Sequence, residues 1–337
     1  MSSQKSSRIL VTGASGFIGG HCVLDLLNHG YEVCGTTRSQ DRSGQVRQLM
    51  KAQGADVTRL SFAEALLTDK AGWPKAMTRC DAVFHVASPV PTVQPKDPED
   101  VIAPARAGTM NVLEAAAEAN IKRVILTSSV ASILGGISED RTYTAADWSD
   151  PEDPHLTPYS LSKTLAEIDA WQFCSENGIQ LTTIHPSLVL GPALEEDYGS
   201  SLEALAKLLK FEVPLLPRFG FEIVDARDVA ALHRIALENE ASVNQRLIAS
   251  NGFLWFRDIA AILKKQYPAR RIPQREMPNW LTRLASIFVP EIGSFIADLD
   301  VVKSLDNSPA RELGWAPREP EAAIKTGAES LIGFGIV

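Results

Sequence analysis

The chain has 337 residues, a formal net charge of −8 at pH 7, and 45% hydrophobic and 22% charged residues. This length supports a substantial core in one large domain or two closely packed ones. The negative charge argues against a nucleic-acid surface and against binding to anionic membranes, because both need basic patches. No apolar run approaches the ~18 residues that a membrane-spanning helix needs, and we expect no secretory signal.

The first half of the sequence alternates short apolar runs with helical patterns. This rhythm predicts an α/β fold with a doubly wound parallel sheet, the Rossmann arrangement. We expect strands at 8–12, 31–37, 59–62, 82–86 and 123–127. We expect helices at 17–29, 45–52, 73–78 and 109–119.

The second half is less regular. Residues 130–156 are rich in Gly, Ser, Asp and Pro and predict a long functional loop. A helix at 158–176 and a strand at 180–185 follow, and two helices at 308–313 and 319–332 close the chain. On the helix at 158–176, we expect a core-facing stripe of Leu161, Leu165 and Ile168.

These patterns predict two parts of unequal size. A dinucleotide-binding domain spans residues 1–187, and residues 223–249 return to it. A smaller C-terminal substrate lobe combines residues 188–222 and 250–337 and covers the carboxyl edge of the sheet.

A glycine-rich turn follows the first strand. Gly13 permits a tight turn, Gly16 lets the backbone approach a phosphate, and Gly19 lets the next helix pack closely. A helix N-terminus offers free N–H groups and partial positive charge to a pyrophosphate. The turn therefore predicts a dinucleotide site, although its three-and-three glycine spacing differs from the common fingerprint.

The end of the second strand indicates which dinucleotide binds. A carboxylate there would bind the ribose hydroxyls of NAD, but residues 35–39 contain none. Arg38 instead supplies a guanidinium suited to the 2′-phosphate of NADP, and Arg42 could add to it. We therefore predict NADPH/NADP+ as the cofactor. Glu195 and its acidic neighbours read as a solvated loop.

A tyrosine and a lysine lie four residues apart on one helix. Thr157 is a plausible N-cap and Pro158 suits the first helical position, so Tyr159 and Lys163 share a face. An ammonium beside a phenol favours the phenolate and lowers the pKa of the tyrosine from ~10. Ser129 follows the fifth strand and could donate a hydrogen bond to a carbonyl. Ser129, Tyr159 and Lys163 are the predicted catalytic residues.

Eight motifs together resemble the extended short-chain dehydrogenases/reductases, in the branch of dihydroflavonol reductases, cinnamoyl-CoA reductases and microbial carbonyl and methylglyoxal reductases. They lie at residues 11–19, 83–89, 126–129, 148–150, 159–163, 185–192, 225–229 and 310–315. The resemblance implies NADPH-dependent reduction of a carbonyl, with Ser129, Tyr159 and Lys163 as the catalytic set.

The resemblance also implies further cofactor contacts. Those predicted beyond the three glycines, Arg38, Tyr159 and Lys163 are Phe17, Ile18, Leu66, Leu67, Val86, Ala87, Ser88, Thr127, Pro186, Ser187, Val189 and Ser201. Two departures stand out. Leu66 replaces an acid that holds the adenine in related chains, and Leu134 replaces an asparagine that binds flavonoid hydroxyls in plant enzymes. Adenine would then be held by packing, and a flavonoid substrate is less expected.

Several other residues have a simpler interpretation. His85 reads as a core histidine, His185 as a residue that shapes the turn before Pro186, and Trp148 as a loop anchor. An apolar substrate pocket could be lined by Val90, Ile133, Leu134, Leu188 and residues near Phe211.

The cysteines and the remaining polar residues point away from metal chemistry. Four cysteines lie far apart in the sequence, at Cys22, Cys34, Cys80 and Cys174. Without a Cys-x-x-Cys pair they predict small buried hydrophobes in a reducing cytoplasm, with neither disulfide framework nor metal site.

Two other functions remain open: a nucleotide-sugar epimerase or steroid-type dehydrogenase on the same fold, and a non-catalytic NADP-sensing module. A sensor would not need Tyr159 and Lys163 together. The expected partner is a small carbonyl substrate, and the protein is expected to be a monomer or homodimer.

Overall fold

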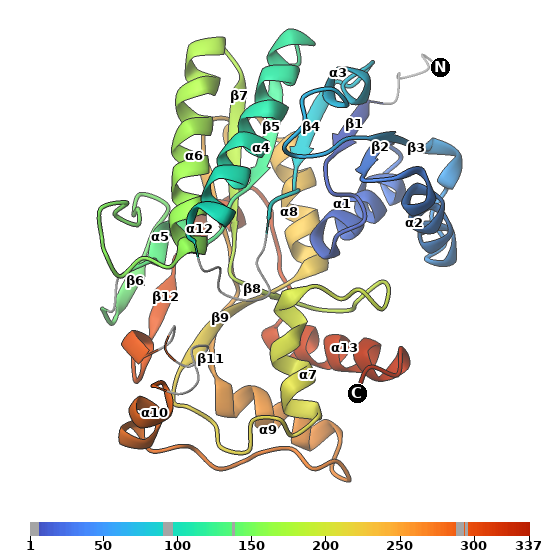
Figure 1. Ribbon diagram of the computed structural model, residues 1–337. Coiled ribbons are helices and arrows are strands. Elements are labelled where there is room, and N and C mark those ends of the chain that lie inside the picture. The colour runs from blue at the N-terminus through green and yellow to red at the C-terminus, as the bar shows by residue number, and fades with distance from the viewer. Residues whose placement is uncertain (1–6, 90–96, 137–138, 288–292, 294–295) are drawn as a thin grey trace.

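A parallel sheet forms the centre of the computed structural model, which describes residues 7–89, 97–136, 139–287, 293 and 296–337. Within these residues, seven strands pair in the order β10-β7-β5-β4-β1-β2-β3 (Figure 1). All neighbours run parallel. The strands are β1 Arg8–Val11, β2 Glu32–Thr37, β3 Leu60–Glu64, β4 Ala82–His85, β5 Arg123–Thr127, β7 Gln180–Pro186 and β10 Arg246–Ala249.

Helices cover both faces of this sheet, because its strands are apolar on both sides. Ile9 and Val11 face α1 Phe17–Asn28, α2 Gln40–Ala52 and α8 Ala226–Glu238. Leu10 faces the opposite layer, made of α3 Trp73–Ala76, α4 Glu99–Glu118 and α6 Pro158–Asn177. Each such leucine, isoleucine or valine stabilises the fold by about 1.5–3 kcal/mol. The predicted doubly wound α/β fold is confirmed.

Another apolar cluster, separate from the two layers on the large sheet, lies beyond the carboxyl edge of that sheet. A small sheet has the order β11-β9-β8, with β8 Leu188–Leu190, β9 Gly220–Asp225 and β11 Phe253–Trp255. Its cluster includes Leu205, Ile259 and Ile324, from α7 Glu203–Leu209, α9 Phe256–Gln266 and α13 Pro320–Gly333. Figure 1 shows these helices below the large sheet, with α10 Asn279–Ala285 at the lower left. This cluster therefore unites segments from before and after β10.

Two predicted helices begin earlier than expected. The helix predicted at 45–52 begins at Gln40, because Ser39 caps it by accepting a hydrogen bond from the Arg42 N–H (3.3 Å). The helix predicted at 109–119 begins at Glu99 and contains Pro104. Because proline usually ends a helix, the residues before Pro104 were not predicted to be helical.

The predicted loop at 130–156 contains regular structure, so that prediction was wrong. It holds α5 Ala131–Leu134 and β6 Arg141–Tyr143. β6 pairs in parallel with β12 Lys303–Leu305, and the Tyr143 side chain is fully buried. The partner strand is far away in the sequence, so no local pattern indicates it. The short helix α12 Ser308–Glu312 follows β12.

The described part of the chain has no helix with the length and apolar character needed to cross a membrane.

Candidate functional site

The carboxyl ends of β1, β4, β5 and β7 meet at one edge of the sheet, because these strands are parallel neighbours. The glycine turn after β1 contacts the segment after β4. Gly13 has a φ of +66°, and a Cβ there would lie 3.0 Å from the Cβ of Ala87. Only glycine combines this backbone with this contact. The predicted cofactor residues Val86 and Ala87 both donate their N–H groups to Thr12 Oγ1 at 2.9 Å.

The third glycine closes the turn from the helix side. A Cβ on Gly19 would lie 2.1 Å from the carbonyl oxygen of Gly13, closer than any real contact. Gly16 is exposed at the N-cap of α1, and its N–H donates to the carbonyl of Gly13 (2.9 Å). Phe17 approaches Gly199, and this contact brings the turn containing Ser201 beside the first turn of α1. The structure thus gathers the predicted phosphate contacts around one helix N-terminus.

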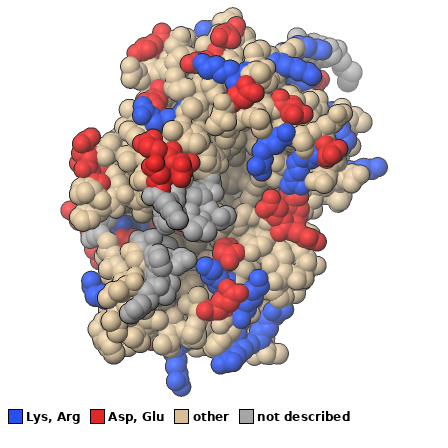
Figure 2. Space-filling view, in the orientation of Figure 1, with Lys and Arg blue, Asp and Glu red and all other residues tan. Residues whose placement is uncertain are grey.

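Two arginines lie near the end of β2. Arg38 is exposed and forms no hydrogen bond or ion pair with another described residue. Arg42 pairs with Glu195 and donates to the carbonyl of Ser15 (3.1 Å). Glu195 is thus engaged in an ion pair, whereas Glu196 and Asp197 are exposed, as predicted for a solvated loop. Figure 2 shows a hollow in this face of the molecule, and both basic and acidic side chains border it.

The predicted adenine contacts differ in exposure. Leu66 is 44% exposed, so its side chain is accessible for the predicted packing against adenine. Leu67 is half-buried, and its carbonyl accepts a hydrogen bond from Asn111 Nδ2 (2.7 Å). The side chain of Leu67 packs against α4, so its contact with a cofactor would be limited.

The predicted nicotinamide-side residues follow β5 and β7. Thr127, Pro186, Ser187 and Val189 are all buried, and Ser88 is half-buried. Thr127 Oγ1 lies 2.7 Å from His233 Nε2, which turns this hydroxyl toward α8. The backbone of Thr127, rather than its hydroxyl, therefore faces the site.

Helix α6 begins as the sequence predicts. Thr157 Oγ1 accepts from the Ser160 N–H (3.1 Å), and Pro158 occupies the first turn. Tyr159 lies at the helix start within reach of Ser129. Burial raises the pKa of Tyr159, and a hydrogen bond with Ser129 opposes that rise. Ser129 Oγ also accepts from the Ala131 N–H (3.1 Å), which fixes the hydroxyl.

Lys163 lies one turn further along α6 and is 8% exposed. Its Nζ donates to the carbonyl of Thr127 (3.3 Å). Burial lowers the pKa of Lys163 to about 8, and the charge of Glu167 opposes this shift. The structure thus brings Ser129, Tyr159 and Lys163 together at the end of β5.

The core-facing stripe predicted on α6 was wrong. Ile168 is 38% exposed, and Leu161 and Leu165 are half-buried. The buried face instead carries polar side chains, including Lys163 and Glu167. Because α6 buries its polar functional residues, the positions of its leucines and isoleucine do not indicate which face is buried.

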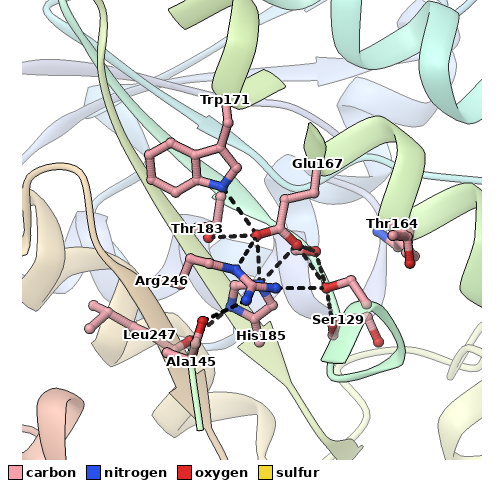
Figure 3. Close-up of polar contacts among 12 residues, drawn as sticks. Ser129, Ala145, Thr164, Glu167, Trp171, Thr183, His185, Arg246 and Leu247 are labelled. Atoms are coloured by element: carbon pink, nitrogen blue, oxygen red, sulfur yellow. Dashed lines mark hydrogen bonds and ion pairs between the residues drawn. The ribbon is translucent and has the colours of Figure 1, made fainter. Parts of the chain in front are cut away.

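Glu167 is the residue that sequence reasoning missed. Its carboxylate is buried and bonded to His185, Arg246 and hydroxyl groups of the turn after β5 (Figure 3). The available signal was its spacing, since Tyr159, Lys163 and Glu167 recur every four residues. His185 belongs to this cluster, and its predicted part in shaping the turn stays a prediction.

The other histidine and tryptophan agree with their simpler readings. His85 is buried, its Nδ1 lies 2.9 Å from Thr12 Oγ1, and burial lowers its pKa to about 3. Trp148 anchors its loop beneath the guanidinium of Arg246, 3.7 Å from the ring centre. Neither side chain needs a catalytic task to explain its position.

The predicted pocket lining is only partly supported. Ile133 is fully buried against Tyr143 and Ile248, so it belongs to the core and not to a pocket wall. Leu134 and Leu188 are half-buried. Val90 lies outside the described residues.

The comparisons with known proteins define the family. The model of the NAD dependent epimerase/dehydratase family matches residues 9–249. Tetraketide alpha-pyrone reductase 1 of Arabidopsis thaliana is 36% identical over 282 residues, covering 81% of this chain and 85% of that protein. Cinnamoyl-CoA reductase 1 of Petunia hybrida is 36% identical over 281 residues, covering 82% of each.

A solved structure of yeast methylglyoxal/isovaleraldehyde reductase complexed with NADPH superposes with a TM-score of 0.81. It is 26% identical and covers 98% of this chain and 100% of that one. The chain therefore belongs to the NAD dependent epimerase/dehydratase family, the extended short-chain dehydrogenases/reductases. It is an NAD(P)-dependent oxidoreductase, and the three relatives named above are reductases. The predicted family, enzyme class and nicotinamide cofactor are confirmed at this level.

Proposed function

We propose that this protein is an NADPH-dependent reductase that converts small aldehydes or ketones to alcohols. The observation that carries the proposal is the meeting of Ser129, Tyr159 and Lys163 beside the glycine turn. Reductase names among the relatives support it, as does the NADPH in the yeast methylglyoxal/isovaleraldehyde reductase. The predicted cofactor residues would hold NADPH along the edge from α1 to β7.

The chemistry that NADPH supplies when bound is a hydride for the carbonyl carbon. Ser129 would donate a hydrogen bond to the carbonyl oxygen and orient it. Tyr159 would give its phenolic proton to the oxygen as negative charge develops, completing the alcohol. The Lys163 ammonium would stabilise the resulting phenolate, because an opposite charge nearby favours the ionised phenol.

Arg38 supports NADPH over NADH in this proposal. Its guanidinium is exposed at the end of β2 and no carboxylate occupies residues 35–39. A 2′-phosphate would find an uncommitted cation there.

We also propose the division predicted from the sequence, with residues 188–222 and 250–337 forming the substrate lobe. Its support is the apolar cluster that joins α7, α9 and α13. The cytoplasmic location, the absence of a metal and the monomeric or dimeric state stay predictions.

The experiment is the absorbance decay of NADPH, and of NADH in parallel, with a panel of aldehydes, keto esters, aryl ketones and dicarbonyls. Faster turnover with NADPH is expected. Tyr159→Phe should lose turnover by on the order of 100-fold or more while it keeps its affinity for NADPH, because only the proton donor is removed. NADPH binding without turnover of any carbonyl would reject the proposal and favour an epimerase or a sensor.

A further inference from the structure

Glu167 lies one helical turn beyond Lys163 and two beyond Tyr159, so the three side chains follow one face of α6. Its side chain is 1% exposed. A buried carboxylate costs several kcal/mol unless charged and polar partners compensate it. Its partners therefore indicate what this arrangement stabilises.

One carboxylate oxygen holds the turn that carries Ser129. Glu167 Oε2 accepts from Ser128 Oγ (2.6 Å) and from Ser132 Oγ (2.7 Å). The Ser132 N–H donates to the carbonyl of Ser129 (3.0 Å). Hydrogen bonds to Glu167 thus link Ser128 and Ser132, which lie on either side of Ser129, to α6. A shift of this turn would move the Ser129 hydroxyl away from Tyr159.

The other oxygen is bound by side chains from β7, β10 and α6 itself. Glu167 Oε1 lies 2.8 Å from His185 Nε2 on β7 and 2.8 Å from Arg246 Nε on β10. Trp171 Nε1 donates to it as well (3.2 Å) (Figure 3). Burial alone would raise the pKa of the Glu167 carboxyl, but His185 and Arg246 lower it well below its usual range. Glu167 is therefore a fixed negative charge.

Arg246 is itself held firmly. Its Nη1 donates to the carbonyls of Ala145 (2.5 Å) and Asp147 (2.7 Å), and its plane covers Trp148. These bonds leave the guanidinium no freedom to turn away from Glu167. Arg246 Nη2 also donates to Ser132 Oγ (3.4 Å), so one guanidinium contacts both the carboxylate and the turn of Ser129.

The negative charge lies close to Lys163. Both residues line a cavity of about 10 Å³, together with Ser88, Thr109 and Ser128. Among the residues that the structure describes, the ionisable groups nearest Lys163 are Tyr159 and Glu167 on α6 and His85 on β4. Of these, the Glu167 carboxylate is the one whose charge favours the ammonium.

We propose that Glu167 is a positioning residue, which holds Ser129 through Ser128 and Ser132 and places a fixed negative charge behind the Lys163 ammonium. It acts through these residues and does not touch the reacting atoms. The inference rests on the proposed carbonyl reduction and extends it to a fourth residue.

The first test compares Glu167→Gln with Asp228→Asn. Asp228 is also a buried carboxylate, bonded to Arg318 near the start of α8, and it contacts none of the three catalytic residues. Glu167→Gln should lower kcat by on the order of 10-fold to 100-fold, with little change in the KM for NADPH. Asp228→Asn should lower stability alone. Equal kcat values in wild type and Glu167→Gln, per NADPH-binding site, would overturn the inference.

The pH profile of kcat/KM separates positioning from mere folding. Lys163 must stay protonated to stabilise the phenolate, so activity falls as pH rises through its pKa. Removing the Glu167 charge should move this fall to lower pH. Ser132→Ala removes one tether of the turn and keeps the charge, so it should lower kcat without moving the profile. It also remains informative if Glu167→Gln fails to fold.

A second readout does not depend on turnover. The Lys163 ammonium can be titrated by the NMR shift of its isotopically labelled side chain, with Lys163→Met as the blank. In Glu167→Gln it should lose its proton at lower pH than in wild type, because the charge that favours the ammonium is gone. An unchanged titration would reject the role of Glu167. A wild-type protein that reduces no carbonyl would instead reject the proposed function, and the titration would still decide this inference.

Discussion

Arg42 and Glu195 form an ion pair that joins α2 to the segment following β8, across the mouth of the glycine turn. The same guanidinium donates to the carbonyl of Ser15 (3.1 Å). Arg42 is therefore already engaged by the protein, whereas Arg38 is not paired with any described residue. A dinucleotide that carries a 2′-phosphate would compete with Glu195 for this cation.

Glu195→Gln should consequently improve the use of NADPH. It removes a carboxylate that would repel the phosphate and frees Arg42, so the KM for NADPH should fall by about 2-fold to 10-fold. The KM for NADH should change little. Initial rates with each cofactor measure this, and the neighbouring Glu196→Gln is the control. An equal change in the KM values for NADPH and NADH would show that Glu195 affects the conformation of its loop and not the binding of the 2′-phosphate.

Arg38→Ala should have the opposite and larger effect. A charge-assisted hydrogen bond is worth about 1.5–3 kcal/mol, so the KM for NADPH should rise by roughly 10-fold to 100-fold. The KM for NADH should stay within about 2-fold, since NADH lacks the phosphate. Lys51→Ala, an exposed cation in the last turn of α2, is the matched control. Equal losses with the two cofactors would remove Arg38 from the 2′-phosphate site.

Lys163→Met should stabilise the cofactor-free protein while it abolishes turnover. Burial lowers the pKa of Lys163 in the folded protein to about 8, below its ordinary value of 10.5. The unfolded chain therefore binds the proton more tightly. The cost of the buried ammonium is fully present below pH 8 and disappears as pH rises toward 10.5.

Urea unfolding without cofactor measures this effect. At pH 7 the free energy of unfolding of Lys163→Met should exceed that of wild type by about 1–3 kcal/mol. The difference should shrink as pH approaches 10.5, the ordinary pKa of a lysine. A variant less stable than wild type at pH 7 would mean that the bond to the Thr127 carbonyl outweighs the cost of burial.

Gly19→Ala should damage both the glycine turn and the fold. Its Cβ would lie 2.1 Å from the Gly13 carbonyl oxygen, so the turn or α1 must move. We expect about 2 kcal/mol or more of destabilisation and a lower affinity for NADPH. Gly44→Ala is the control, because nothing lies within 4 Å of its added Cβ and the residue is exposed in α2. That change should stabilise the protein by about 0.5–1 kcal/mol. Normal NADPH binding by Gly19→Ala would contradict the close packing.

The glycine turn and the sheet could be predicted because their signals are local. Gly13 follows an apolar strand, and Gly19 lies in the first turn of the helix after it. The strands β1, β2, β3, β4, β5 and β7 each appear as a short apolar run, whereas β10 was not predicted. Tyr159 and Lys163 were equally visible from their spacing and from Thr157 at the helix start.

The partners of Glu167 could not be predicted in the same way. His185 and Arg246 come from strands 18 and 79 residues further along the chain. A single acid on a helix usually indicates a solvated face, and only the three-dimensional arrangement shows this one to be buried. The pairing of Tyr143 in β6 with Leu305 in β12 was hidden for the same reason.

The apolar cluster beyond the sheet has a consequence for constructing hybrid enzymes. Leu205 lies before β10 in the chain, whereas Ile259 and Ile324 lie after it, yet all three pack in one core. A chimaera that exchanged only the C-terminal segment with a relative would place foreign α9 and α13 against the resident α7. Mismatched volumes in such a core cost about 1–3 kcal/mol at each site. Replacing this core with that of a relative therefore requires both segments to be exchanged together.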